Sequence, residues 1–330
     1  MSNKTVLVTG GAGYIGSHVV RQLGEAGENV VTLDNMIFGH AEAVLYGDLV
    51  QGDTGDRAVV EKVIKNYDVD TIMHFAAYTA VPESVSDPLK YYHNNTCSAM
   101  SLIQTALNAG VKNFVFSSTA AVYGIVEQDA PITESAPLAP INPYGLSKLM
   151  TEQILRDTAA VNDFNYVAIR YFNVAGADPQ CRIGAYPKDV LLLIKAACEV
   201  AVGKRPELQI FGTDYPTPDG TGIRDYIHVE DIASAHVKTL DYLRNGGESA
   251  IFNCGYGHGY SVREVLNAVQ KVHGKAINIV EKPRRAGDPP SLIADSSLIR
   301  EKTGWQPAYD NLEKIVEHAL NWEKKLCDSA

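Results

Sequence analysis

Tyr144 and Lys148 are the residues of this sequence whose types and spacing most directly suggest acid–base chemistry. They follow Pro143, and the stretch from Leu146 to Ala160 is rich in helix-forming residues, so the pair is expected at the start of a helix. Residues four apart on a helix share one face, and a nearby ammonium lowers the phenol pKa from its usual value of about 10. A Tyr-x-x-x-Lys pair can therefore transfer protons, although the same spacing is also typical of an ordinary surface pair.

A glycine-rich turn near the start of the chain predicts a dinucleotide cofactor. A β-branched strand at residues 5–9 leads into Gly10, Gly13 and Gly16, then a helix at 14–25 and a second strand at 30–33 that ends in Asp34. The glycines allow a tight turn and let a helix N-terminus approach a pyrophosphate. Asp34, eighteen residues after Gly16, can accept hydrogen bonds from a ribose diol and repels a 2′-phosphate. The segment therefore favours NAD over NADP.

Apolar strands continue to alternate with helices, which predicts a Rossmann-type, doubly wound parallel α/β sheet covered on both faces. Further strands are expected at residues 49–51, 69–75, 113–118 and 166–170, and helices at 57–67, 88–109 and from Tyr144 onward. Ligands of such sheets bind outside the carboxyl ends of the strands. The strand ends that should converge there are Gly10, Asp34, Asp53, Ala76, Thr119 and Tyr171.

The pattern becomes mixed after residue 173. Loop-like stretches are expected at 174–188 and 212–224, helices at 190–202, 230–243, 261–273 and 312–325, and strands at 250–253 and 277–280. We therefore expect an NAD-binding Rossmann domain at residues 1–173, to which segments at about 224–254 return. A smaller mixed α/β substrate domain is expected at 174–330.

Composition narrows the classes of partner. The 330-residue chain has a net charge of −10 and no long basic run, which argues against nucleic acid and anionic membranes. No signal-peptide core or bilayer-length apolar run is apparent. Five scattered cysteines without a CxxC pair indicate free thiols in a reducing cytoplasm, and no metal site is expected.

Five segments together resemble the extended short-chain dehydrogenase/reductase family: Thr9–Gly16, Phe116–Thr119, Tyr144–Lys148, Arg170–Asn173 and Arg224–His228. Within that family, four more resemble the UDP-glucose 4-epimerases (UDP-galactose 4-epimerases): His74–Ala77, Glu83–Ser84, Pro216–His228 and Pro283–Asp288. The resemblance extends from residue 5 to about 320 and is weaker at 36–50 and 177–198.

The resemblance implies an isomerase of galactose metabolism that epimerises C4 of a UDP-hexose through a transient 4-keto sugar, with a tightly held NAD. Tyr144 would act as the base at the 4-hydroxyl, with Lys148 and the positive nicotinamide lowering its pKa and Thr119 hydrogen-bonding the same oxygen. The implied NAD-binding residues are Gly10, Gly13, Tyr14, Ile15, Gly16, Asp34, Asn35, Asp53, Thr54, Phe75, Ala76, Ala77, Asn94, Ser117, Tyr144, Lys148 and Phe172. The implied substrate-binding residues are Thr119, Tyr144, Asn173, Phe211, Arg224, Arg285 and Asp288. A homodimer through the helices at about 88–109 and 144–162 is also implied.

Three positions depart from the family pattern. Some members carry a lysine where Thr79 stands, and many carry Asn or His where this chain has Leu192, in a region that touches the nucleotide. Leu292 falls where the family sets the pocket width, so glucose and galactose are expected first, with N-acetylhexosamine sugars as an alternative. A nucleotide-sugar 4,6-dehydratase is the other alternative, but Ala120 and Ala121 stand where such an enzyme needs an acid and a base. Two further alternative functions are a reductase that releases NADH and a non-catalytic NAD sensor on the same fold.

Overall fold

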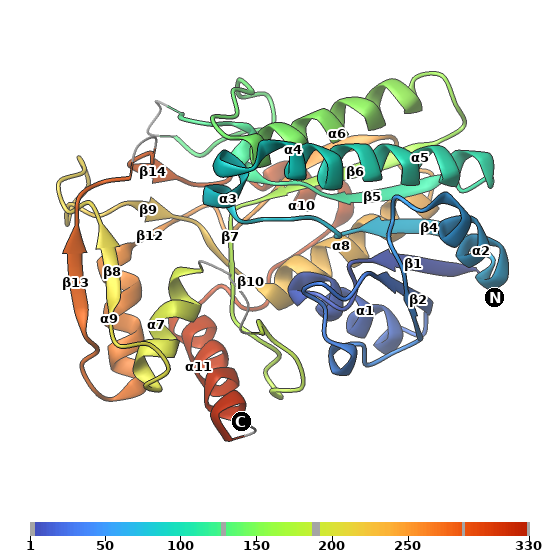
Figure 1. The fold of residues 1–330 in the computed structure, drawn as a ribbon. Coiled ribbons are helices and arrows are strands. Elements are labelled where there is room, and N and C mark those ends of the chain that lie inside the picture. Colours follow the sequence, from blue (N-terminus) through green and yellow to red (C-terminus); the bar gives the residue numbers. More distant parts are fainter. Residues whose placement is uncertain (1–3, 127–129, 187–191, 286–287, 329–330) are drawn as a thin grey trace.

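Seven short apolar segments form one parallel sheet, in the spatial order β3-β2-β1-β4-β5-β6-β11 (Figure 1). The computed structural model describes residues 4–126, 130–186, 192–285 and 288–328. Each neighbouring pair of the sheet runs parallel, so all carboxyl ends lie at one edge. The strands are β1 (Thr5–Thr9), β2 (Asn29–Asp34), β3 (Asp48–Gln51), β4 (Val69–His74), β5 (Asn113–Ser117), β6 (Asn165–Tyr171) and β11 (Ala250–Cys254). The expected doubly wound parallel α/β fold is confirmed.

Helices cover both faces of this sheet because its strands are apolar on both sides. In β1, Val6 and Val8 pack into one core cluster, whereas Leu7 between them packs into the other. The first face is covered by α1 (Tyr14–Glu25) and α8 (Val229–Arg244), which also pack against each other. The second is covered by α2 (Arg57–Tyr67), α5 (Ser98–Asn108) and α6 (Pro143–Ala159) (Figure 1).

Apart from α8, α10 and β11, the segments after β6 form small sheets and a helical group beside the carboxyl edge of the main sheet, toward the left of Figure 1. Helices α7 (Leu193–Ala201), α9 (Val262–His273) and α11 (Leu312–Asp328) pack against one another. The short strands are β7 (Asn173–Ala175), β8 (Leu208–Phe211), β9 (Ile223–Arg224), β10 (Tyr226–His228), β12 (Tyr260–Ser261), β13 (Ile279–Lys282) and β14 (Ser291–Leu292). Helix α10 (Ser297–Thr303) packs against α8 and β11.

Several boundaries differ from those expected from the sequence. The helix expected over 88–109 is divided into α4 (Pro88–Tyr91), a π-helical turn (Tyr92–Cys97) and α5. Eight further short elements, of two to seven residues each, were not expected: strands β7, β8, β9, β10, β12 and β14 and helices α3 (Val81–Ser86) and α10. Of the helix expected from residue 190, residues 190–191 lie outside the described part, and α7 begins at Leu193. Among the described helices, none has the length and apolar character needed to cross a membrane.

Candidate active site

Helix α6 begins where the sequence predicted and brings Tyr144 and Lys148 to its buried face. Pro143 occupies the first turn, and the Asn142 side chain caps the helix by accepting a hydrogen bond from the Gly145 backbone N–H at 2.8 Å. Tyr144 is 8% exposed and Lys148 is 3% exposed. The interpretation as an ordinary surface pair is therefore excluded.

The Tyr144 phenol lies in a largely dry environment. Burial raises its pKa above the usual value, and a hydrogen bond with the Thr119 side chain opposes that rise. Thr119 lies two residues after the end of β5, and its hydroxyl also accepts a hydrogen bond from the Ala121 backbone N–H at 3.1 Å. The net pKa shift of the phenol in the protein alone is therefore upward, so the lowering expected from Lys148 does not arise from the protein chain by itself.

The Lys148 ammonium is held at the carboxyl end of β5. Its Nζ donates to the Ser117 backbone carbonyl at 2.9 Å and lies 4.9 Å from the centre of the Phe116 ring. Burial lowers the Lys148 pKa to about 7, and the Glu152 carboxylate opposes that fall. With a pKa near neutrality, the protonation of Lys148 depends on the few charged groups around it.

The glycine turn after β1 is closely packed. Gly10 has φ +72°, and a Cβ on it would lie 2.5 Å from the Ala76 backbone nitrogen after β4. A Cβ on Gly16 would lie 2.3 Å from the Gly10 carbonyl oxygen. Both positions require glycine for close backbone approach, and the turn leaves the start of α1 facing the carboxyl edge of the sheet.

A cleft of about 580 Å³, including its open mouth, lies beside this turn. The Asp34 carboxylate at the end of β2 accepts hydrogen bonds from the backbone N–H groups of Ala12 (3.1 Å) and Met36 (2.9 Å), and burial raises its pKa. The residues that line the cleft are Gly10, Gly13, Leu33, Asp34, Asn35, Ile37, Phe38, Gly39, Gly52, Asp53, Thr54, Phe75, Ala76, Ala77, Tyr78 and Asn94. This lining contains two carboxylates and no Lys or Arg, so it suits a ribose diol rather than a 2′-phosphate and fits NAD.

The cleft brings together ten of the residues that the resemblance implied for NAD, and six others that the sequence did not indicate. Phe38 is 43% exposed, and its ring packs edge-on against Tyr78 at 5.7 Å between ring centres. Leu33, Ile37, Gly39 and Gly52 are the other four. Ile37, Phe38 and Gly39 fall in the stretch where the resemblance was weak, so no motif marked them.

The remaining implied NAD residues lie outside that lining. Ile15 packs against the main core, and Phe172 packs on a small buried cluster around Val122 and Tyr123. The Ser117 hydroxyl forms a hydrogen bond with the Tyr171 hydroxyl at 2.7 Å. These contacts give the side chains structural partners, and the cleft itself is built without them.

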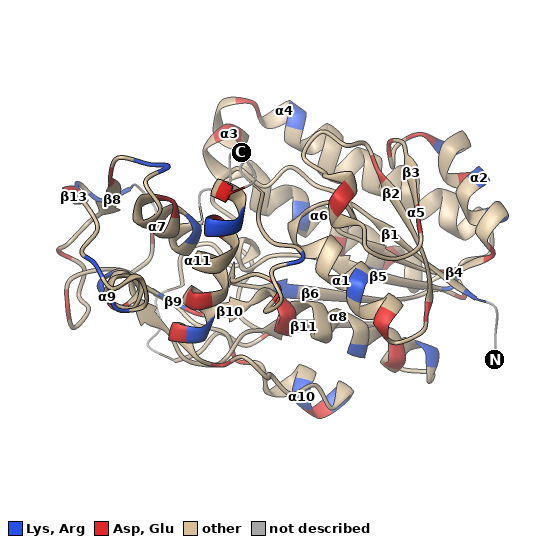
Figure 2. Cartoon of the chain, turned by 90° about the horizontal axis from the view of Figure 1, so that it is seen from below, with Lys and Arg blue, Asp and Glu red and all other residues tan. Residues whose placement is uncertain are grey.

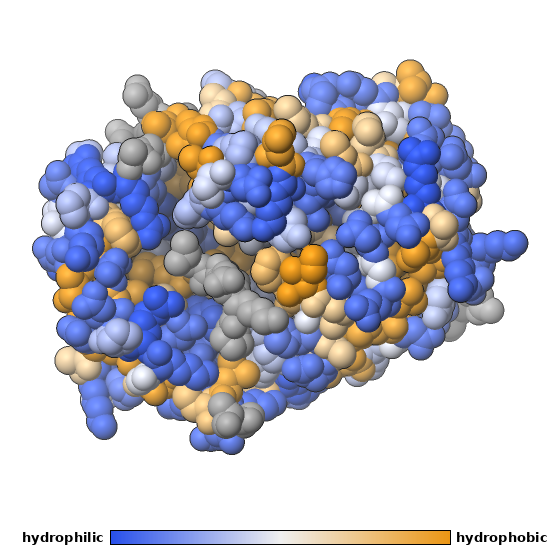
Figure 3. Space-filling model, in the orientation of Figure 1, coloured by the Kyte–Doolittle hydropathy of each residue, from blue (hydrophilic) through white to orange (hydrophobic). Residues whose placement is uncertain are grey.

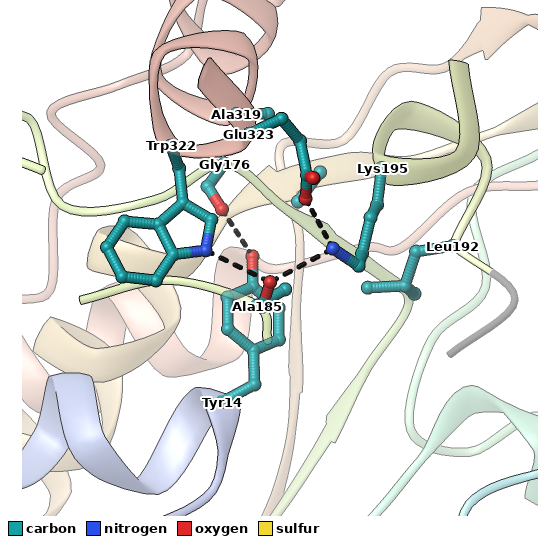
Figure 4. Close-up of a pocket in the computed structure, with 9 residues that line it drawn as sticks. Tyr14, Gly176, Ala185, Leu192, Lys195, Ala319, Trp322 and Glu323 are labelled. Atoms are coloured by element: carbon teal, nitrogen blue, oxygen red, sulfur yellow. Dashed lines mark hydrogen bonds and ion pairs between the residues drawn. The ribbon is translucent and has the colours of Figure 1, made fainter. Parts of the chain in front are cut away.

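Tyr14 and Leu192 line a second, smaller pocket between α1, β7, α7 and α11 (Figure 4). The Tyr14 hydroxyl donates to the Gly176 carbonyl at 2.7 Å, so the side chain points away from the cofactor cleft. The Ala185 carbonyl accepts hydrogen bonds from Lys195 Nζ and from the Trp322 indole N–H, both at 3.0 Å. Leu192 lines the same pocket, at the position where the family pattern often has Asn or His.

Four of the seven residues implied for substrate binding form two pairs, each of which contains an arginine. Arg224 in β9 forms an ion pair with Asp288 and donates to the Ile223 carbonyl at 2.7 Å. The Arg285 guanidinium lies 3.9 Å from the centre of the Phe211 ring. The Asp288 backbone N–H donates to the Arg285 carbonyl at 3.4 Å, so the two pairs lie next to each other.

Three further positions identified from the sequence are one more implied substrate-binding residue, Asn173, and two departures from the family pattern, Thr79 and Leu292. The Asn173 backbone N–H donates to the Asp225 carbonyl at 3.0 Å, directly after Arg224 in the chain. Thr79 is exposed. Leu292 in β14 packs on the same small cluster as Phe172. Leu292 therefore lies between the strand that carries Arg224 and the cluster beside Thr119.

Comparison with known proteins places this geometry in a family. The family model described as the NAD dependent epimerase/dehydratase family matches residues 6–255. A UDP-glucose 4-epimerase of Azospirillum brasilense is 53% identical over 97% of this chain and 92% of its own length.

Solved structures give the same result. The UDP-glucose-4-epimerase of Stenotrophomonas maltophila, solved with bound NAD and formylated UDP-arabinopyranose, is 38% identical with a TM-score of 0.96, covering 99% of this chain and 100% of its own. The UDP-Glc/GlcNAc 4-epimerase of Campylobacter jejuni is 49% identical with a TM-score of 0.86, covering 98% and 99%. On these findings, the chain belongs to the NAD dependent epimerase/dehydratase family.

Proposed function

We propose that this protein is an isomerase that interconverts UDP-glucose and UDP-galactose by NAD-dependent epimerisation at C4. The observation that carries the proposal is the buried Tyr144/Lys148 pair on α6, beside Thr119 and at the same sheet edge as a cleft that fits NAD. The UDP-glucose 4-epimerases among the relatives support the same reaction and do not favour the dehydratase or N-acetylhexosamine alternatives.

In this proposal Tyr144 removes the proton from the sugar 4-hydroxyl and later returns it. NAD, when bound, supplies a nicotinamide that can accept a hydride from C4 and give it back. Thr119, which forms a hydrogen bond with the Tyr144 side chain, is proposed to contact the same sugar oxygen. Lys148 and the positive nicotinamide of bound NAD are together proposed to favour the phenolate of Tyr144 electrostatically. Burial of the pair excludes water from the transient 4-keto sugar. Because neither side chain is consumed, the residues end each turnover as they began it.

Arg224 and Arg285 are proposed to bind the diphosphate, with Asp288 at the ribose, and Phe211 and Asn173 beside the nucleotide and sugar. Guanidinium groups suit a diphosphate because their planar N–H groups donate in pairs. In the structure Arg224 forms an ion pair with Asp288, so diphosphate binding would replace one anionic partner of the guanidinium by another. Two local arginines are sufficient to attract a polyanion to a chain whose net charge is −10.

The proposed activity is tested by incubating the purified protein with UDP-galactose, without added NAD, and following UDP-glucose by NMR. We expect interconversion to an equilibrium mixture, because the cofactor is retained and regenerated in each cycle. A parallel reaction with NAD supplied covers loss of cofactor during purification. No interconversion in either reaction would overturn the proposed function.

We further propose a homodimer that pairs α4, α5 and α6 with their counterparts. Large apolar side chains on these helices and just after them are exposed: Leu89 (77%), Met100 (50%), Met150 (40%) and Val161 (80%). Figure 3 has orange side chains among blue ones along the upper edge, where these helices lie in Figure 1. Measurement of the solution mass, with Leu89→Lys as the interface variant, tests this.

The location and domain division remain proposals as well. A reducing cytoplasm is supported by the five cysteines, all of which are free thiols. In Figure 2 the Lys and Arg positions are interspersed with Asp and Glu positions along the ribbon rather than gathered in one part of it. This distribution favours a small-molecule substrate over a nucleic acid. A division near residue 173, with the later segments around α8 and β11 returning to the NAD-binding part, is supported by the parallel pairing of β11 with β6.

A further inference from the structure

A buried ion pair lies one helical turn beyond Lys148. Tyr144, Lys148 and Glu152 are spaced four apart along α6 and so share one face. The Glu152 carboxylate accepts two hydrogen bonds from Arg170 in β6, from Nε at 3.0 Å and from Nη2 at 2.6 Å. Both side chains are 2% exposed. A paired guanidinium and carboxylate in this setting hold each other in one orientation.

The backbone at the end of β5 connects this ion pair to Lys148. The Ser117 carbonyl accepts from Lys148 Nζ, and the hydroxyl of the next residue, Ser118, donates to Glu152 at 2.5 Å. Arg170 also donates to the Tyr123 hydroxyl at 3.0 Å. The carboxylate is therefore fixed by groups from β5 and β6 as well as by its own helix.

The other polar groups around Lys148 cannot balance its charge. His74 of β4 is buried, and its pKa falls to about 3, mainly through burial and also through the charge of Lys148, so it stays neutral. Burial raises the pKa of Tyr171 of β6, as it does that of Tyr144, so both are neutral phenols in the protein alone. The direct acceptor, the Ser117 carbonyl, carries no charge. Among the described residues, Glu152 is the carboxylate that acts on the ammonium.

An isolated buried ammonium tends to lose its proton, whereas a nearby carboxylate favours the charged form. Buried ion pairs can often be replaced by apolar residues without loss of stability, so stability alone does not explain one at this position. We propose that Glu152, held in place by Arg170 and Ser118, is a positioning residue that keeps Lys148 charged during turnover and so favours the phenolate form of Tyr144, which is the form that acts as the base. This inference rests on the proposed function of Tyr144 as the base.

The test is the double variant Glu152→Gln/Arg170→Gln, which keeps hydrogen-bonding groups and leaves no unpaired buried charge. Glu152→Gln alone would strand Arg170 and is expected to unfold easily. The matched control is Asp70→Asn/Arg244→Gln. It removes a bidentate pair that is less buried, with side chains 23% and 11% exposed and contacts of 3.1 and 2.8 Å, at the opposite end of β4 from His74. Arg244 also pairs with Glu28, which is 29% exposed and can be solvated when the arginine is removed.

Two measurements are made on the NAD-loaded proteins. The first is the pH profile of kcat and KM with UDP-galactose. We expect the active pH range of the Glu152/Arg170 variant to narrow by about one unit at each side, because Lys148 loses its proton earlier and Tyr144 loses its proton later. KM and bound NAD should match those of the control. An unchanged profile, or an equal fall in kcat at every pH, would overturn the inference.

The second measurement is the ultraviolet titration of the Tyr144 phenol, obtained by subtracting the spectrum of the same protein carrying Tyr144→Phe. We expect phenolate formation to move to higher pH by about one unit in the Glu152/Arg170 variant and not in the control. Because this titration needs no turnover, it distinguishes failure of the inference from failure of the proposed function. An unmoved titration in a folded variant would refute the role of Glu152.

Discussion

Replacing Gly10 by alanine should damage the cofactor turn far more than an equivalent change at Gly27. Both glycines have left-handed backbones, with φ +72° and +83°. An alanine in that region costs about 1–2 kcal/mol at either site. At Gly10 the new Cβ would also meet backbone atoms, at 2.5 Å from Ala76 N and 2.9 Å from Phe75 C, whereas at Gly27 nothing lies within 4 Å. Forced overpacking of this kind adds about 1–3 kcal/mol.

We therefore expect Gly10→Ala to lower the free energy of unfolding by about 2–5 kcal/mol and Gly27→Ala by about 1–2 kcal/mol. Because Ala76 lines the cofactor cleft, the first variant should also lose bound NAD, and the second should retain it. The assay is urea unfolding of the NAD-free proteins, because bound NAD would add its own stabilisation to whichever variant retains it. The NAD content of each purified protein is measured separately after denaturation. Equal destabilisation, or full NAD content in Gly10→Ala, would refute the close-approach argument.

Tyr144→Phe should keep the fold and bound NAD but lower kcat by about 100- to 10,000-fold, since the phenol hydroxyl is the proposed base; near-normal turnover would contradict that role. Arg224→Gln should raise the KM for UDP-galactose by about tenfold or more through loss of a charged contact, measured against Arg263→Gln, whose partner Glu281 is exposed. His236→Asn should reduce acid sensitivity. Burial lowers the His236 pKa to about 4, from an unfolded value of about 6.5, so the unfolded chain gains a proton that the folded one refuses and stability is lost as pH falls between those values. Urea unfolding at pH 6.5 and pH 5 should then show the wild type losing about 2 kcal/mol more than the variant, and parallel losses would refute the assignment.

The sequence by itself determined the local parts of the site. The three glycines, Asp34 and the Tyr144/Lys148 pair were identified correctly as a turn, a strand end and one helix face, because each depends on neighbours within a few residues. A helix was expected over 261–273 for the same reason, and in the structure Ser261 and Glu264 cap the first turn of α9 reciprocally. The parallel sheet followed from strand and helix alternation, which needs no knowledge of distant contacts.

Only the tertiary structure decided which distant residues contact each other in the site and which of its titratable side chains carry a charge. Phe38 and Tyr78 meet at the mouth of the cleft although forty residues separate them, and no pattern in either segment marks the contact. The Tyr144 phenol is made less acidic by burial, which the Tyr-x-x-x-Lys spacing could not reveal. In the sequence, Glu152 cannot be distinguished from a solvent-exposed helix glutamate. Only the folded structure shows that it is buried and paired with Arg170 of β6. Spacing along the chain fixes which side chains can share a face, but desolvation and long-range pairing, which fix their protonation, exist only once the sheet has brought separate segments together.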